Sequence, residues 1–174
     1  MTAPLAVRPA DTEYKPYYGT YIAKVPEGDV LRTLETQMVD TLALIRGIPE
    51  AKGTHRYAPG KWSIKQVVAH VSDAERIFAY RALRAARGDA TPLPSFDENA
   101  YAEAADFDRI PLADLATELA HVRAATVALF RHLEPDALTR FVTASDAPVT
   151  PRAIAYIIAG HERHHVGLLK ERYL

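Results

Sequence analysis

Two histidines in the last part of the chain, His161 and His165, have the spacing of a metal-binding pair. Side chains four residues apart on a helix lie one above the other, so two imidazoles at this spacing can reach a single ion. The chain contains seven histidines, and with that number the spacing alone is a weak signal. The surroundings of each histidine therefore decide whether a site is present.

Three histidines interrupt stripes of apolar side chains that recur with a helical period. His70 precedes Val71 on one stripe, and His161 and His165 follow Ile158 on another. A buried imidazole without a partner costs about 1–3 kcal/mol, so three such positions call for a shared explanation. We interpret them as ligands of one divalent ion. The alternative is three separate core histidines, each hydrogen-bonded to a carbonyl or carboxylate.

Another interpretation of the same residues is the zinc-protease motif H-E-x-x-H, in which Glu162 would be the general base. Proteases of this kind take a third ligand downstream of the motif. Only nine residues follow His165 here and none is histidine, so we do not expect a protease.

Three imidazoles leave at least one coordination position open, which is typical of a reactive site. The chain has no cysteine, so the ligands must be nitrogen or oxygen. Zinc is our first expectation, with nickel, iron(II) and manganese as alternatives. Asp73 and Glu162 lie near the histidines in sequence, and we expect them to orient an imidazole or to handle a proton.

The elements that must position these residues are four amphipathic helices. Apolar residues recur at steps of three and four along each of the ranges 29–47, 63–88, 111–133 and 150–169. Four such helices predict an all-α bundle of one domain.

Sequence signals for the helix starts support these ranges. Ser63 and Gln66 match a capping box, Asp29 suits an N-cap, and Thr150 followed by Pro151 suits an N-cap and first helical residue.

Two segments lie outside the predicted helices. Residues 1–28 alternate prolines with tyrosines and predict an irregular arm packed on the bundle of residues 29–174. Residues 89–110 predict a long ordered connection. Tyr17, Tyr18, Tyr21 and the segment SFDENAY at 95–101 could overhang the histidine pocket. We find no signal for a β-hairpin.

The composition argues against several classes of partner. The 174 residues hold 21 basic and 22 acidic side chains, a net charge of -1, without a long run of either sign. This balance argues against nucleic acid or a membrane surface as the main partner. The start MTAPLAVRP and the longest apolar run, AIAYIIA, suit neither a signal peptide nor a membrane span, so we expect a soluble cytoplasmic protein.

The segments GKWSIKQVVAHVSDAERIF at 60–78 and AGHERHHVGLL at 159–169 resemble the two signature regions of the DinB/YfiT-like family. The resemblance covers about residues 29–173. It implies a four-helix bundle of up-down-down-up type whose metal is held by His70, His161 and His165, and it implies a homodimer. One departure is Leu168, where many members have glutamine.

The resemblance also implies more than one activity. Some members resemble thiol S-transferases that use low-molecular-weight thiols such as bacillithiol or mycothiol, and others resemble hydrolases. Our first hypothesis is a metal-dependent S-transferase joining such a thiol to a small electrophile. The alternatives are a hydrolase that uses metal-activated water and a non-catalytic, metal-stabilised stress-response or binding module.

Overall fold

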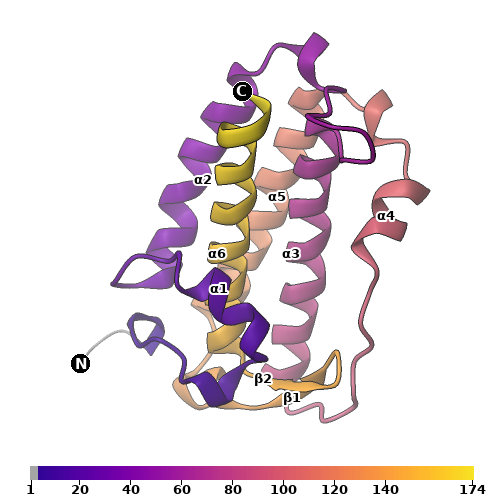
Figure 1. The fold of residues 1–174 in the computed structure, drawn as a ribbon. Coiled ribbons are helices and arrows are strands. Elements are labelled where there is room, and N and C mark those ends of the chain that lie inside the picture. Colours follow the sequence, from indigo (N-terminus) through magenta and orange to yellow (C-terminus); the bar gives the residue numbers. More distant parts are fainter. Residues whose placement is uncertain (1–3) are drawn as a thin grey trace.

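Four long helices form a bundle in the computed structural model, which describes residues 4–174 (Figure 1). The first three residues of the predicted arm lie outside the described residues. The long helices are α2 (Val30–Gly47), α3 (Ile64–Ala86), α5 (Leu112–Arg131) and α6 (Pro151–Leu168). The predicted all-α bundle is confirmed.

The helices begin where their capping residues predict. The Asp29 carboxylate accepts a hydrogen bond from the backbone N–H of Leu31 at the start of α2. At the start of α3, Ser63 and Gln66 form the reciprocal capping box. Thr150 accepts from the backbone of α6, which starts at a proline. These caps determine where α3 and α6 begin, and the apolar face of each helix turns its histidines toward the core.

The direction of the helices requires one long crossover. Helices α2 and α6 run toward the end of the bundle where the chain terminates, whereas α3 and α5 run the opposite way (Figure 1). The connection between the parallel helices α3 and α5 therefore returns along the whole bundle. It contains the short helix α4 (Glu98–Ala104), whose seven residues are too few to show a clear apolar period.

A two-stranded hairpin precedes α6, and the expectation that the chain has no β-hairpin was therefore wrong. Strand β1 (Val142–Ala144) pairs antiparallel with β2 (Ala147–Val149). The turn residues Ser145 and Asp146 have φ of 53° and 61°, a left-handed conformation that usually favours glycine or asparagine. Three-residue strands joined by Ser-Asp carry little sequence signal.

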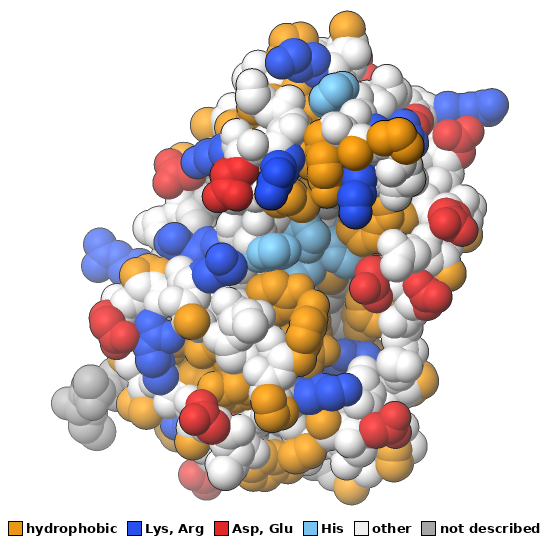
Figure 2. Space-filling model, viewed as in Figure 1, with side chains coloured by type: hydrophobic (Ala, Val, Ile, Leu, Met, Phe, Trp, Pro, Cys, Tyr) orange, Lys and Arg blue, Asp and Glu red, His pale blue; other side chains and the backbone are white. Residues whose placement is uncertain are grey.

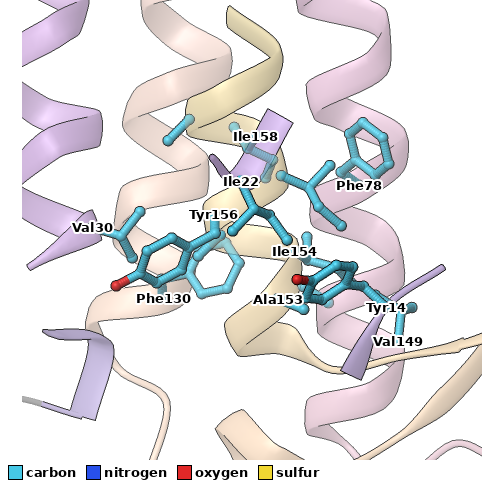
Figure 3. Close-up of a cluster of buried hydrophobic side chains, with 14 of the residues drawn as sticks. Tyr14, Ile22, Val30, Phe78, Phe130, Val149, Ala153, Ile154, Tyr156 and Ile158 are labelled. Carbon is cyan, nitrogen blue, oxygen red and sulfur yellow. The ribbon is translucent and has the colours of Figure 1, made fainter. Parts of the chain in front are cut away.

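The N-terminal arm contributes to the core of the bundle. Its helix α1 (Gly19–Ile22) packs on α6, and Tyr14 and Ile22 are buried among side chains of the long helices (Figure 3). Glu13, also buried, accepts a hydrogen bond of 2.7 Å from the Thr150 hydroxyl and pairs with Arg152. These bonds attach the arm to the start of α6. The domain boundary after residue 28 stays a prediction.

Short helical segments complete the chain. A π-helical turn, Leu169–Tyr173, continues α6. The 3-10 segments are Pro4–Ala6, Asp11–Glu13, Pro16–Tyr18, Glu50–Lys52, Phe107–Arg109 and Pro135–Thr139. Within residues 4–174, none of the helices combines the length and the apolar character that a membrane span requires.

Candidate metal centre

Helices α3 and α6 bring His70, His161 and His165 together inside the bundle. One ring nitrogen of each lies within 4.8 Å of the others. The Nε2 atom of His161 is 3.1 Å from Nε2 of His70 and 3.1 Å from Nε2 of His165. Two nitrogens bound tetrahedrally to one zinc ion stand about 3.3 Å apart, so both Nε2 distances from His161 are close to the spacing of zinc ligands.

The environment of the imidazoles favours their neutral form, which is the form that binds metal. Burial lowers the pKa of His70 to about 4 and that of His165 to about 3, and it also lowers the pKa of His161. Positive charge on the neighbouring histidines adds to each shift. The Nδ1 atom of His165 is buried and has no hydrogen-bond partner among residues 4–174. This donor set, three neutral nitrogens without a paired carboxylate, fits a divalent ion.

Aromatic rings hold the histidines in place from several elements. The Trp62 ring lies 4.7 Å from the His70 ring, between centroids. The Tyr21 ring meets the His161 ring edge-on at 5.4 Å. His164 is half-buried, with its ring 5.0 Å from that of His165. Such packing restricts the rotation of the imidazoles and keeps their Nε2 atoms directed at one point.

A cavity of about 130 Å³ opens beside two of the three histidines. The histidines are visible at the bottom of a hollow on the face of the molecule shown in Figure 2. The walls are mainly aromatic and come from the arm, α3, the crossover connection and the hairpin turn. The lining residues are Tyr17, Tyr18, Tyr21, His70, Ala74, Phe78, Phe96, Glu98, Ser145 and His161.

The arm and the crossover connection overhang the cavity, which is the possibility raised for their aromatic residues. Tyr17, Tyr18 and Tyr21 of the arm line the cavity, together with Phe96 and Glu98 of the connection. The hydroxyls of Tyr17 and Tyr21 are 3.0 Å apart and share a hydrogen bond. Burial raises the pKa of the Tyr21 hydroxyl, and the Tyr17 hydroxyl adds to the rise, so Tyr21 is a neutral hydrogen-bond donor at neutral pH.

Glu162 lies next to His161 in sequence but takes part in a different network. Its carboxylate accepts hydrogen bonds from Thr41 at 2.5 Å, from Arg123 at 2.7 Å and from Gln37. Arg123 also binds Glu75 through two bonds of 2.8 Å. The carboxylate is thus committed to a buried ion network and does not line the aromatic cavity. This placement also argues against the zinc-protease role for Glu162.

Asp73 likewise is not among the residues that line the cavity. Its carboxylate lies 3.2 Å from Arg76, which also binds Glu118 of α5 at 2.7 Å. Burial raises the pKa of Asp73, and the Arg76 guanidinium opposes that rise. The structure therefore brings together the three predicted histidines but neither of the two carboxylates predicted to handle protons.

The sequence did not identify three of the wall residues as parts of a site. Ala74 and Phe78 follow His70 by four and eight residues, so helical spacing could have placed them on the same face. Ser145 carries no such signal, because it reaches the cavity through the unpredicted hairpin.

Comparisons with known proteins agree with this fold. Residues 33–169 match the DinB superfamily. A protein of Oceanobacillus iheyensis, provisionally named a metal-dependent hydrolase, is 25% identical over 142 residues, which cover 80% of this chain and 81% of that protein.

Two solved structures share the fold. YfiT from Bacillus subtilis, described as a probable metal-dependent hydrolase with an unusual four-helix bundle topology, matches with a TM-score of 0.68 at 18% identity, covering 97% of this chain and 95% of that one. A mycothiol-dependent maleylpyruvate isomerase matches with a TM-score of 0.67 at 17% identity, over 83% of this chain. The match spans only 61% of the isomerase chain.

Proposed function

Because the chain belongs to the DinB superfamily, we propose that it is a divalent-metal-dependent enzyme that joins a low-molecular-weight thiol to a small electrophile. His70, His161 and His165 would hold the ion through their Nε2 atoms. Zinc is the first choice, and nickel, iron(II) and manganese are the alternatives. The thiol would be of the bacillithiol or mycothiol kind, and one solved relative is itself mycothiol-dependent.

The observation that carries this proposal is the contrast between the histidines and the carboxylates. Two of the three imidazoles, those of His70 and His161, line an aromatic cavity, whereas Asp73 and Glu162 are both engaged elsewhere. Glu98, the carboxylate among the described lining residues, is exposed at the rim. A thiol has a pKa of about 8.5 and water one of about 15.7, so a thiol needs far less help from a base. A cavity with this lining therefore suits a thiol better than water.

A bound divalent ion would supply positive charge that lowers the pKa of an incoming thiol. The residues of the chain would do the rest. The tyrosine and phenylalanine walls would exclude water and pack against the electrophile, and the Tyr21 hydroxyl would donate a hydrogen bond to it. In the reaction a sulfur–carbon bond forms, the leaving group departs with its electron pair, and the thiol proton passes to solvent.

A conjugation assay with model reagents tests this proposal. Zinc-loaded protein is mixed with L-cysteine and 1-chloro-2,4-dinitrobenzene, and the thioether product is followed by its absorbance. We expect turnover that requires metal and is lost in His70→Ala, with an unchanged circular dichroism spectrum. Equal rates for the parent and the folded variant would contradict the proposal. Because the natural thiol is unidentified, the assay is repeated with bacillithiol and mycothiol.

Metal-assisted hydrolysis is the second candidate, and the names of two relatives favour it. The same three histidines would hold the ion, and water would replace the thiol as nucleophile. Cleavage of 4-nitrophenyl acetate without thiol, lost in His70→Ala, would favour this candidate over the first. A full complement of metal with neither reaction would favour a non-catalytic, metal-stabilised module.

Two further expectations accompany the proposed function. We propose a cytoplasmic location, where low-molecular-weight thiols are kept reduced. We also propose a homodimer without nucleic acid or membrane as a partner. Light scattering coupled to gel filtration would test the dimer, since a mass near 19.2 kDa would indicate a monomer.

A further inference from the structure

Two arginines are buried to the same extent in this protein, but only one of them has acidic partners. Arg81 and Arg123 are each 3% exposed. Arg123 pairs with Glu75 and Glu162, whereas Arg81 forms no ion pair with any acidic side chain of residues 4–174. A buried guanidinium keeps its charge, and a buried charge without a counter-charge is costly. The charge of Arg81 is thus available for an anion that the chain itself does not provide.

The position of Arg81 connects it to the aromatic cavity. It follows His70 by eleven residues, which is about three helical turns, so both side chains leave α3 on the same face. Phe78 lies between them and lines the cavity, and the Arg81 guanidinium stands 5.8 Å from the centre of its ring. Arg81 does not itself line the cavity, but it lies directly behind the wall residues Phe78 and Ser145, farther along α3 than His70.

Hydroxyl groups link the guanidinium to the cavity wall. Arg81 Nη2 donates a hydrogen bond of 3.0 Å to the Ser145 hydroxyl and one of 2.9 Å to the Pro94 carbonyl. Ser145 and Tyr18 both line the cavity. Burial raises the pKa of the Tyr18 hydroxyl, and the nearby Arg81 guanidinium opposes that rise.

We propose that Arg81, Ser145 and Tyr18 form a subsite for a carboxylate group of the substrate. The two hydroxyls would contact the carboxylate, and the guanidinium beside them would supply the charge. A substrate held there would extend along the aromatic walls toward the histidines. The electrophile of the proposed function would then be a small carboxylic acid. The identity of the reaction rests on that proposed function, whereas binding of the carboxylate does not.

The charges around the cavity favour an anion at this end. Glu98 also lines the cavity, but it is exposed and its field is screened by solvent and salt. Arg81 is buried, so its field is screened much less. Lys15 lines a small adjoining pocket together with Tyr18 and Arg81, but it is exposed like Glu98, so its field is screened in the same way. The buried glutamates of the described residues all have cationic partners: Glu75 and Glu162 pair with Arg123, and Glu13 pairs with Arg152.

A purely structural role is the competing explanation for Arg81. Its two bonds join α3 to the crossover connection and to the hairpin turn, and a neutral hydrogen-bond donor could replace them. Arg81→Gln separates the two roles, because glutamine keeps donor groups but removes the charge. Arg81→Lys keeps the charge and alters the geometry.

The test compares an acid with the amide of the same shape. Isothermal titration measures the affinity of zinc-loaded protein for 3-phenylpropanoate and for 3-phenylpropanamide, with no thiol or electrophile present. We expect the acid to bind at least tenfold tighter than the amide. This preference should vanish in Arg81→Gln, weaken severalfold in Ser145→Ala and Tyr18→Phe, and remain in His161→Ala, since that variant removes a metal ligand but leaves the subsite intact.

Three results would overturn the subsite. One is equal affinity of the parent protein for acid and amide. Another is an undiminished preference in Arg81→Gln or, if that variant does not fold, in both hydroxyl variants. The third is loss of the preference in folded His161→Ala, which would identify the ion as the anion acceptor. A protein that binds the acid through Arg81 but conjugates no thiol would retain the subsite and refute only the proposed reaction.

Discussion

The backbone of Tyr21 lies directly on Gly160, one residue before the metal-ligand candidate His161. A Cβ atom at position 160 would stand 2.0 Å from the Tyr21 carbonyl oxygen and 2.4 Å from its carbonyl carbon. Only glycine permits this approach of α1 to α6. The contact places the Tyr21 ring against His161 and so forms one wall of the cavity.

Gly160→Ala should therefore push α1 away from α6. We expect the free energy of unfolding to fall by about 1–3 kcal/mol, as for other overpacked positions. Urea denaturation measures this change. Gly167→Ala is the matched control on the same helix, because a Cβ there meets nothing within 4 Å. The control should be neutral or stabilised by up to about 1 kcal/mol. Equal effects of the two substitutions would contradict the close packing of α1.

Removal of a ligand should abolish stoichiometric metal binding. His70→Ala and His161→Ala should each lose most of the metal that the untagged parent protein retains after gel filtration, because two imidazoles bind a divalent ion much less tightly than three. Elemental analysis by mass spectrometry measures metal per chain. His164→Ala is the control, since His164 lies beside His165 yet is outside the ligand set. Full metal content in both ligand variants would refute the site.

The metal-free protein should lose stability as the pH falls from about 6.5 to about 4. Burial lowers the pKa of His70 to about 4, so in this interval the unfolded chain takes up a proton there and the folded protein does not. The contribution of neutral His70 to the free energy of unfolding is fully present above about pH 6.5, the pKa of histidine in the unfolded chain. It declines as the pH falls below that value, by up to about 3 kcal/mol.

Comparison with His70→Ala isolates this contribution, because the carboxylates that titrate in the same interval are common to both proteins. Denaturant unfolding at pH 7, 5.5 and 4.5 should show a shallower pH dependence in the variant. Parallel curves would mean that His70 is not buried as a neutral imidazole.

Glu162 and Asp73 should differ strongly in their effect on stability. Glu162→Ala removes an acceptor of three buried hydrogen bonds, and we expect a loss of about 2–3 kcal/mol, with Arg123 still paired to Glu75. Asp73→Ala removes a partly exposed pair with Arg76 and should cost less than about 1 kcal/mol. Thermal unfolding of both variants measures this difference in stability. A Glu162→Ala protein as stable as its parent, but inactive, would restore the proton-handling role.

The helices and the histidine cluster were predictable because local rules determine them. Caps such as Ser63 and Thr150 depend on residues within one turn. His161 and His165 share a face through helical spacing, and His70 could be added because it interrupts a second apolar stripe. Both apolar stripes face the same core, so the histidines that lie on them meet there.

The orientation of the nearby carboxylates could not be read from spacing. Glu162 is one residue, or about 100°, from His161 around the helix, and its direction is decided by Thr41 and Arg123 on other helices. The hairpin was missed for a related reason. Its turn at Ser145 adopts a left-handed conformation that the surrounding tertiary contacts hold, while the residues themselves do not favour it.

The cavity combines two kinds of structure that can change independently. The three imidazoles stand on long helices in the centre of the bundle, whereas most of the opposite wall comes from the arm, the crossover connection and the hairpin turn. Connecting segments tolerate replacement far better than the helices they join. Exchange of these three segments between related proteins should therefore alter which substrates are accepted and leave the capacity to hold the ion unchanged. A single helical scaffold can then acquire different chemistry through changes in its connecting segments.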